Sequence, residues 1–166
     1  MKVFVWGVVA AAVASLAAGQ DLKERALALH RSAIVVDTHE DVPERLEKEW
    51  VDLSVRSKTG HVDIPRWREG GVTAPFLAAY VNAGYATSGG AAKKALEFID
   101  LIHRLAESNP KDLVFADSVA GIRQAKKDGR IAVLIGIEGG HAIEDSLGAL
   151  SAFYRLGVRY MTLTHT

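Results

Sequence analysis

The chain has 166 residues, of which 49% are apolar, and its 20 Lys and Arg side chains balance its 20 Asp and Glu side chains. A chain of zero net charge without a basic segment gives no electrostatic reason to expect nucleic acid as a partner. It contains no cysteine, which excludes disulfides, cysteine metal ligands and thiol nucleophiles. The length is sufficient for one domain with a sizeable core.

The first residues have the form of a secretory signal peptide. Lys2 precedes an apolar run that continues to Ala18, and small residues stand just before the polar segment that begins at Gln20. This pattern predicts cleavage near residues 18–20 and export to the periplasm or the medium. The alternative is an uncleaved anchor helix, but the run is short for a membrane span of about 20 residues. We therefore expect a signal peptide over residues 1–19, one domain over residues 20–166, and no stable membrane insertion after cleavage.

The first part of the mature chain begins with a short amphipathic helix, predicted over residues 22–30 from the spacing of its apolar side chains. Residues 33–37 (AIVVD) form a compact β-branched run that is typical of a buried strand. Residues 40–60 are polar and charged, and we expect them to form a long connection. Residues 72–81 predict a second strand.

The remaining chain alternates between the two kinds of element. The pattern predicts helices over residues 91–107, 118–128 and 146–156, and strands over residues 113–116, 131–137 and 158–163. Such alternation indicates parallel strands with helices outside the sheet, that is, the α/β class. Because no helix follows the last strand to cover it, we expect that the chain is truncated.

Chemically capable side chains follow three of these strands. His39 and Asp41 are two residues apart in extended backbone, so that both can reach one metal ion. Glu138 ends an otherwise apolar strand, where an unpaired carboxylate would be costly to bury. His165 follows the last strand. Each signal alone is weak, since Glu138 could equally be a solvated or helix-capping residue, but one shared cation explains all of them.

Other histidines have simpler interpretations. His61 lies in a loop and is expected to play a structural role, and His141, which follows two glycines, is expected to order its loop rather than bind metal. His30 and His103 fall within amphipathic helices.

Several segments resemble the membrane (renal-type) dipeptidases, peptidase family M19. They are residues 36–43 (VDTHEDVP), 60–66 (GHVDIPR), 135–143 (IGIEGGHAI) and 156–165 (LGVRYMTLTH). The resemblance extends from about Leu22 to the last residue. Thr38 and Glu40 replace the Gly and Asn that are more common in the first motif, which leaves the ligands unchanged.

This resemblance implies the N-terminal half of a metal-dependent (β/α)8 barrel, truncated after about four strands. It implies two zinc ions, with His39 and Asp41 binding one of them, Glu138 bridging both, and His165 holding the substrate. The nucleophile would be a metal-bound hydroxide and the substrate a dipeptide. The family's two remaining zinc histidines, its arginine for the substrate carboxylate and its acid/base aspartate would lie beyond Thr166, so the second metal site would be incomplete.

Two hypotheses follow from the sequence. The first is a zinc-dependent dipeptidase, present here as an N-terminal fragment that is inactive alone and could form a homodimer through its open sheet edge. The alternative is an exported ligand-binding protein or pseudogene product with the same fold and no catalytic activity.

Overall fold

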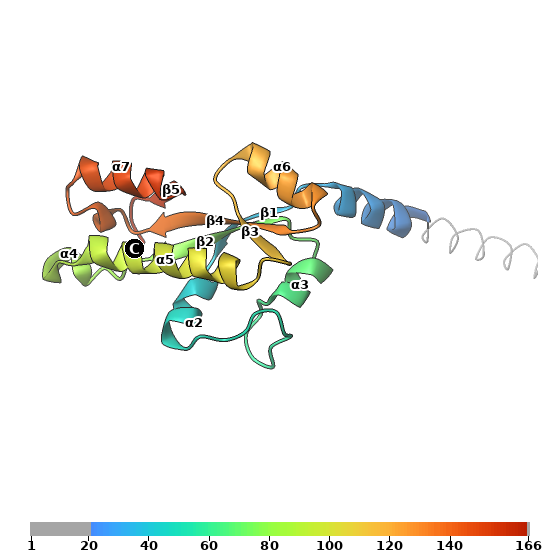
Figure 1. Ribbon diagram of the computed structural model, residues 1–166, viewed down its shortest axis with the longest axis horizontal. Coiled ribbons are helices and arrows are strands. Elements are labelled where there is room, and N and C mark those ends of the chain that lie inside the picture. Colours follow the sequence, from blue (N-terminus) through green and yellow to red (C-terminus); the bar gives the residue numbers. More distant parts are fainter. Residues whose placement is uncertain (1–20, 166) are drawn as a thin grey trace, which may run out of the picture. The chain divides into compact units, whose positions relative to one another are not determined.

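The computed structural model describes residues 21–165, and the chain divides into two compact units, Met1–Ala33 and Ile34–Thr166 (Figure 1). In the first unit residues 21–32 are helical, which agrees with the helix predicted over residues 22–30. The predicted signal peptide lies outside the described residues. Among residues 21–165, no helix combines the length and the apolar character needed to span a bilayer.

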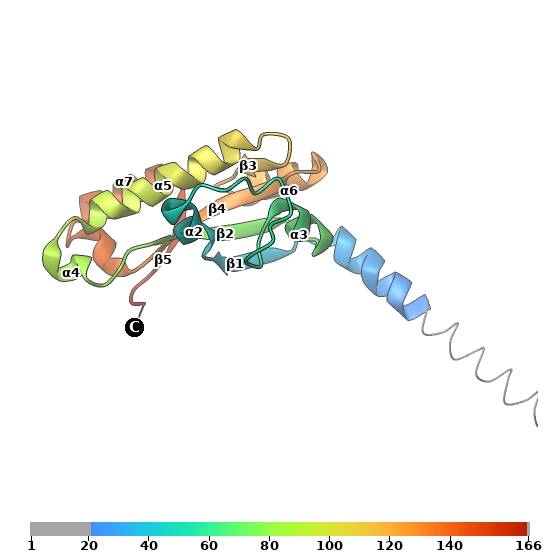
Figure 2. The same ribbon diagram turned by 90° about the horizontal axis from the view of Figure 1, so that it is seen from below.

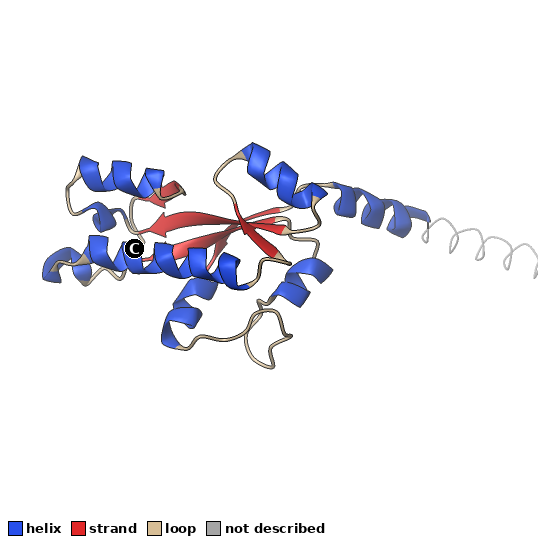
Figure 3. Cartoon of the chain, viewed as in Figure 1, coloured by secondary structure: helices blue, strands red, loops and turns tan. Residues whose placement is uncertain are grey.

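The second unit contains a five-stranded sheet in which every pairing is parallel. The strands are β1 (Val36–Glu40), β2 (Ala74–Tyr80), β3 (Leu113–Phe115), β4 (Ile131–Glu138) and β5 (Val158–Thr162). The helices are α2 (Val42–Lys48), α3 (Ile64–Glu69), α4 (Tyr85–Ser88), α5 (Ala91–Ser108), α6 (Val119–Lys127) and α7 (Leu147–Arg155), with a 3₁₀ turn η1 (Gly140–Ile143). Figure 3 shows the strands gathered in the middle of this unit with helices around them. The predicted α/β class is therefore confirmed.

β4 is the central strand of the sheet, and its apolar sequence explains why. All of its residues except Glu138 are buried, as expected for a parallel strand that is covered on both faces. β2 pairs with one edge of β4, and β1 pairs with β2. The opposite edge is shared by two strands, because β3 pairs with Ile131–Val133 and β5 with Ile135–Glu138. The strands β1, β2, β4 and β5 thus follow one another in order across the sheet, and Figure 2 shows the first three of them side by side.

The two faces of the sheet pack against different helices. On one face Leu77, Ile135 and Ile137 belong to the main core cluster, together with buried side chains of α2, α3, α5 and α7. The long helix α5 contributes the largest share, because its apolar side chains recur along one stripe. On the other face Ala74 and Leu134 form a smaller cluster with residues of α6. This smaller cluster covers the amino-terminal half of β2 and β4, so polar side chains can lie on the same face nearer their carboxyl ends.

Two predictions for the start of the unit were wrong. The first strand begins at Val36 instead of residue 33, and it is not buried, since Ile34 is 40% and Val36 42% exposed. Within the described chain β1 pairs with β2 alone, so one of its edges has no neighbouring strand. The expected connection over residues 40–60 contains α2, which buries Val42, Pro43 and Leu46.

Gly157 holds the tight turn between α7 and β5. Its φ of 101° lies in the left-handed region, and a Cβ atom there would lie 2.2 Å from Cζ of Phe115. We expect Gly157→Ala to lower the free energy of unfolding by about 3 kcal/mol, because backbone strain and a steric clash act together. Urea unfolding of the 166-residue chain measures this effect.

Gly129→Ala is the matched control. Gly129 also has a positive φ, 70°, but nothing lies within 4 Å of the added Cβ. Strain alone should cost about 1 kcal/mol here. Equal losses for the two variants would contradict the proposed clash with Phe115.

Candidate metal centre

His39, Asp41 and Glu138 come together at the carboxyl ends of β1 and β4. Nε2 of His39 lies 3.1 Å from Oδ1 of Asp41 and 3.2 Å from Oε2 of Glu138. The three ligand atoms lie within 4.8 Å of one another. The parallel sheet explains this proximity, because β1 and β4 are both neighbours of β2 and point in the same direction. The structure thus brings together the three side chains that the sequence singled out as metal ligands.

His165 lies at the same carboxyl end of the sheet, beyond the last residue of β5. Its Nε2 is 3.6 Å from Oε1 of Glu138, so the two oxygens of Glu138 face two different imidazoles. The ring of His165 lies 5.2 Å from the ring of Tyr80, which ends β2. The His165 side chain is 41% exposed and can therefore reach a molecule that enters from solvent.

The donor set fits a divalent cation. Within residues 21–165, the ion-pair partners of Asp41 and Glu138 are imidazole rings rather than Lys or Arg side chains. A neutral imidazole can donate only one hydrogen from Nε2, so it cannot satisfy both carboxylates that face it. A cation between the three groups would satisfy all of them, and one nitrogen with two oxygen ligands suits zinc or a similar divalent ion.

Negative charge accumulates around this centre and affects neighbouring groups. Burial, with the carboxylates of Asp37 and Asp41, raises the pKa of Glu40. Burial also raises the pKa of Tyr160 to about 12, helped by the charges of Glu138, Asp41 and Asp37. The Tyr160 hydroxyl therefore stays protonated at neutral pH. Both shifts have the direction expected beside a group of carboxylates.

The sequence patterns alone did not point to Tyr160. Its hydroxyl lies 2.8 Å from Nδ1 of His39, on the side of the ring opposite the two carboxylates. One signal was present in the sequence. Gly136, over which the Tyr160 ring lies, interrupts the apolar strand β4, and a glycine inside a strand often marks a close approach by another group.

The loop that follows Glu138 is fixed to the elements around it. The Gly139 N–H donates to Oγ1 of Thr162 at 3.0 Å, and the Gly140 N–H donates to the carbonyl of Leu163 at 3.1 Å. Nε2 of His141 lies 3.1 Å from the carbonyl of Asn82, which agrees with the loop-ordering role predicted for this histidine. The carboxylate of Glu144 accepts the Ala91 N–H at 2.7 Å, at the first residue of α5.

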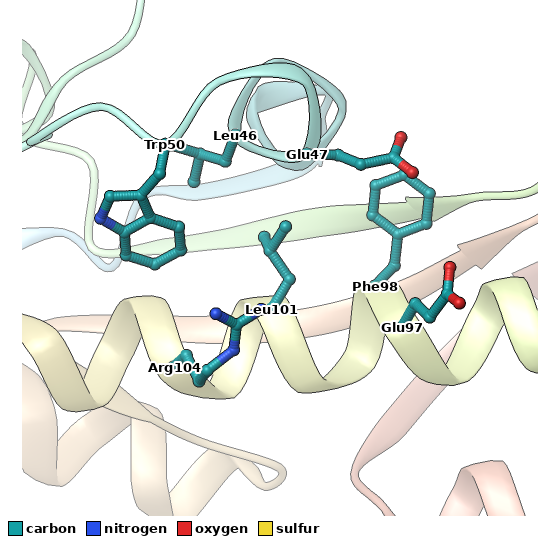
Figure 4. A pocket seen from close by; sticks show the side chains of 7 residues that line it. All are labelled: Leu46, Glu47, Trp50, Glu97, Phe98, Leu101 and Arg104. Atoms are coloured by element: carbon teal, nitrogen blue, oxygen red, sulfur yellow. The ribbon is translucent and has the colours of Figure 1, made fainter.

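A recess of about 280 Å³ between α2 and α5 is separate from this centre (Figure 4). Trp50 and Arg104 line one part of it, with the guanidinium 5.6 Å from the indole ring, and Glu47 and Glu97 line another. The recess shares no residue with the group of His39, Asp41 and Glu138. It is therefore not part of the candidate metal centre.

Comparison with known proteins decides the family. The family model described as membrane dipeptidase, peptidase family M19, matches residues 23–166. The chain belongs to this family. Membrane dipeptidases of family M19 are metal-dependent peptidases, and the family assignment that the sequence motifs suggested is thus confirmed.

Curated relatives include dipeptidase 3 of mouse and of human. The mouse protein is 41% identical over 150 residues, which cover 87% of this chain and 29% of the relative. The human protein is 41% identical over 151 residues, which cover 88% of this chain and 30% of the relative. The chain thus spans about three tenths of the length of these members of the membrane dipeptidase family.

Solved metallopeptidase structures, one of them described as a member of family M19, resemble the chain in fold. The metallopeptidase dipeptidase AC aligns with a TM-score of 0.67 and 26% identity, over 79% of this chain and 42% of that one. A metallopeptidase from Rhodobacter sphaeroides, bound to a phosphinate mimic of the dipeptide L-Ala-D-Ala, aligns with a TM-score of 0.66 and 25% identity, over 79% and 45% of the two chains. The parallel sheet therefore corresponds to part of the TIM-type barrel of these dipeptidases, as expected.

Proposed function

We propose that this chain supplies three metal ligands and a substrate-binding histidine of a zinc-dependent dipeptidase. One observation carries the proposal: the ligand atoms of His39, Asp41 and Glu138 lie within 4.8 Å of one another at the carboxyl ends of parallel strands. In barrels of this class the catalytic groups gather at that end of the strands. Membership of the membrane dipeptidase family supports the reaction, hydrolysis of the peptide bond of a dipeptide.

Each side chain has a distinct role in this proposal. His39 offers Nε2 to the ion, and Asp41 and Glu138 offer carboxylate oxygens. A bound divalent ion would supply Lewis-acid activation of water and of the scissile carbonyl. His165 would donate a hydrogen bond to the carbonyl oxygen of the substrate. Its position 3.6 Å from Glu138 and its partial exposure support this role.

We further propose that the 166-residue chain binds one zinc ion and does not hydrolyse dipeptides by itself. Three protein ligands with an open fourth position are typical of a catalytic zinc site. A second ion would have only Glu138 as a ligand among the described residues. His39, Asp41 and Glu138 form the one group of three potential metal ligands found there, and the first ion already uses this group.

The experiment combines metal analysis with an assay. The purified 166-residue chain is loaded with zinc, freed of excess ion and analysed for bound metal, and L-Ala-D-Ala is offered as substrate, because the phosphinate in the Rhodobacter relative mimics that dipeptide. We expect one zinc ion per chain and no hydrolysis, with binding lost in the chelator-treated sample. Two ions held per chain would contradict the proposed single ion, and zinc-dependent hydrolysis would contradict the proposed inactivity. Absence of bound metal would contradict the metal site.

The alternative is a binding protein without catalytic function. The partly exposed His165 and the ring of Tyr80 beside it favour contact with a small ligand at the same edge of the sheet. Two results together would favour this alternative. The zinc-loaded chain would bind the phosphinate dipeptide mimic tightly, and a preparation extended to the length of the relatives would still not hydrolyse L-Ala-D-Ala.

We also propose export through residues 1–19. Expression of the 166-residue chain with its own N-terminus, followed by N-terminal sequencing of the exported product, tests this proposal. A product that begins near residue 20 supports cleavage, and an intact Met1 on the exported chain contradicts it.

A further inference from the structure

Tyr160 reaches across the sheet from β5 to β1. Its hydroxyl lies 2.8 Å from Nδ1 of His39, although the two residues are 121 positions apart in the chain. Nε2 of the same imidazole faces Asp41 and Glu138 at 3.1 and 3.2 Å. One ring nitrogen of His39 thus points to the carboxylates and the other to a single hydroxyl group.

Gly136 makes room for this tyrosine. Gly136 is the register partner of Tyr160 in the pairing of β4 with β5. A Cβ atom at Gly136 would lie 2.1 Å from Cζ of Tyr160 and 2.4 Å from its Cε1, so the ring lies directly over the glycine. The centroid of the Phe76 ring, on β2, lies 5.1 Å from the centroid of the Tyr160 ring. The strand order brings Tyr160 over β4, and the missing side chain at Gly136 lets the ring lie low enough to reach His39.

The two nitrogens of a metal-binding imidazole have different requirements. The ligand nitrogen must offer its lone pair, so in the neutral ring the other nitrogen carries the hydrogen. A hydrogen-bond acceptor beside that second nitrogen selects this tautomer and fixes the orientation of the ring. The hydroxyl oxygen of Tyr160, 2.8 Å from Nδ1 of His39, can serve as such an acceptor when Nδ1 carries the hydrogen.

We propose that Tyr160, seated over Gly136, is a positioning residue that holds His39 with Nδ1 protonated and Nε2 directed at a divalent ion. This inference rests on the metal site of the proposed function and adds to it a residue that does not touch the ion. It also explains why a glycine occupies position 136 in an otherwise apolar, buried strand.

Tyr160→Phe removes the hydroxyl and keeps the ring. We expect the affinity of the 166-residue chain for zinc, measured by competition with a chromogenic chelator, to fall about 10- to 100-fold, as is typical when the partner of a metal-binding histidine is lost. Far-ultraviolet circular dichroism and the melting temperature of the metal-free chain should stay close to those of the wild type. Tyr154→Phe is the matched control, because Tyr154 is 63% exposed on α7 and should not affect zinc affinity.

Two further measurements distinguish positioning from a general structural effect. In the zinc-loaded chain labelled with ¹⁵N-histidine, we expect the Nδ1–H of His39 to exchange slowly with solvent in the wild type and faster in Tyr160→Phe. Gly136→Ala should displace the ring and weaken zinc binding without altering any ligand. The double variant should lose little more than either single one, because both changes break the same contact.

The outcomes separate the inference from the proposed function. Zinc binding by the wild type with an unchanged affinity in Tyr160→Phe would overturn the role of Tyr160 alone. No zinc binding by the wild type would overturn the metal site and this inference with it.

Discussion

Replacing Glu138 with Gln is expected to weaken zinc binding by the 166-residue chain by at least about 100-fold. Loss of a group that only supports a ligand typically costs 10- to 100-fold in affinity, so loss of a ligand should cost at least the upper end of that range. Glu138 is also the residue whose two oxygens face both His39 and His165. Competition with a chromogenic chelator measures the affinity.

Stability provides a second criterion for Glu138→Gln. The substitution keeps the shape of the side chain and removes one of the negative charges that gather around His39, so the metal-free chain should not be destabilised. Glu44→Gln is the matched control, because Glu44 lies on α2 and pairs with Lys48. We expect zinc affinity to be unchanged in this control. Equal affinity of Glu138→Gln and the wild type would exclude Glu138 as a ligand.

Replacing Asp63 with Ala is expected to lower the free energy of unfolding by about 3 kcal/mol. Asp63 is fully buried and is the N-cap of α3. Its carboxylate accepts the N–H groups of Arg66 and Ser57 at 2.8 and 3.0 Å and forms an ion pair with the Arg66 guanidinium. Removal of the carboxylate leaves these donors without their acceptor, and Arg66 loses its counter-charge. Urea unfolding at neutral pH measures the loss.

A second N-cap serves as the control for Asp63. Ser118 caps α6 by accepting the Gly121 N–H, but it is exposed and, among residues 21–165, pairs with no charged group. Ser118→Ala should therefore cost about 1 kcal/mol, the usual effect of losing a cap. If Asp63→Ala cost no more than Ser118→Ala, the buried ion pair with Arg66 would contribute nothing measurable.

The acid dependence of stability should also report on Asp63. Burial alone would raise the pKa of this carboxyl group, but the N–H groups of Ser57 and Arg66 and the Arg66 guanidinium outweigh it and lower the pKa. A lowered pKa in the folded chain means that the contribution is present above the ordinary value of about 4 and is lost as the pH falls further. Unfolding measured between pH 5 and pH 2 should thus show a smaller decline for Asp63→Ala than for the wild type.

Much of the fold could be predicted because its strands and helices are locally distinctive. The continuous apolar run of β4 and the long stripe of α5 define these elements with few alternatives. The start of β1 was placed three residues early, because the apolar residues Ile34 and Val35 precede the strand instead of forming its centre. α2 was missed among charged residues, although the i, i+4 spacing of Val42 and Leu46, with Pro43 between them, is itself typical of the first turns of a helix.

The candidate site could be predicted in its members but not in its geometry. His39, Asp41 and Glu138 were identifiable because each follows or ends a strand, where the carboxyl ends of parallel strands meet. The contact between Tyr160 and His39 was not predictable in the same way. It depends on the order β1, β2, β4, β5 across the sheet and on the absence of a side chain at Gly136, and neither is evident from residues that are 121 positions apart.

The position of Glu138 at the end of β4 links metal binding to folding. Glu138 is the last residue of the strand on which β2, β3 and β5 all assemble, and the groups around it come from opposite ends of the second unit. An unfolded chain therefore offers no preformed nest for a cation, and an ion that binds only the folded form at 100 times its dissociation constant would add about 2.7 kcal/mol to stability. Zinc binding and folding of the second unit would then be thermodynamically linked, so that removal of zinc would lower the stability of the folded chain by about this amount.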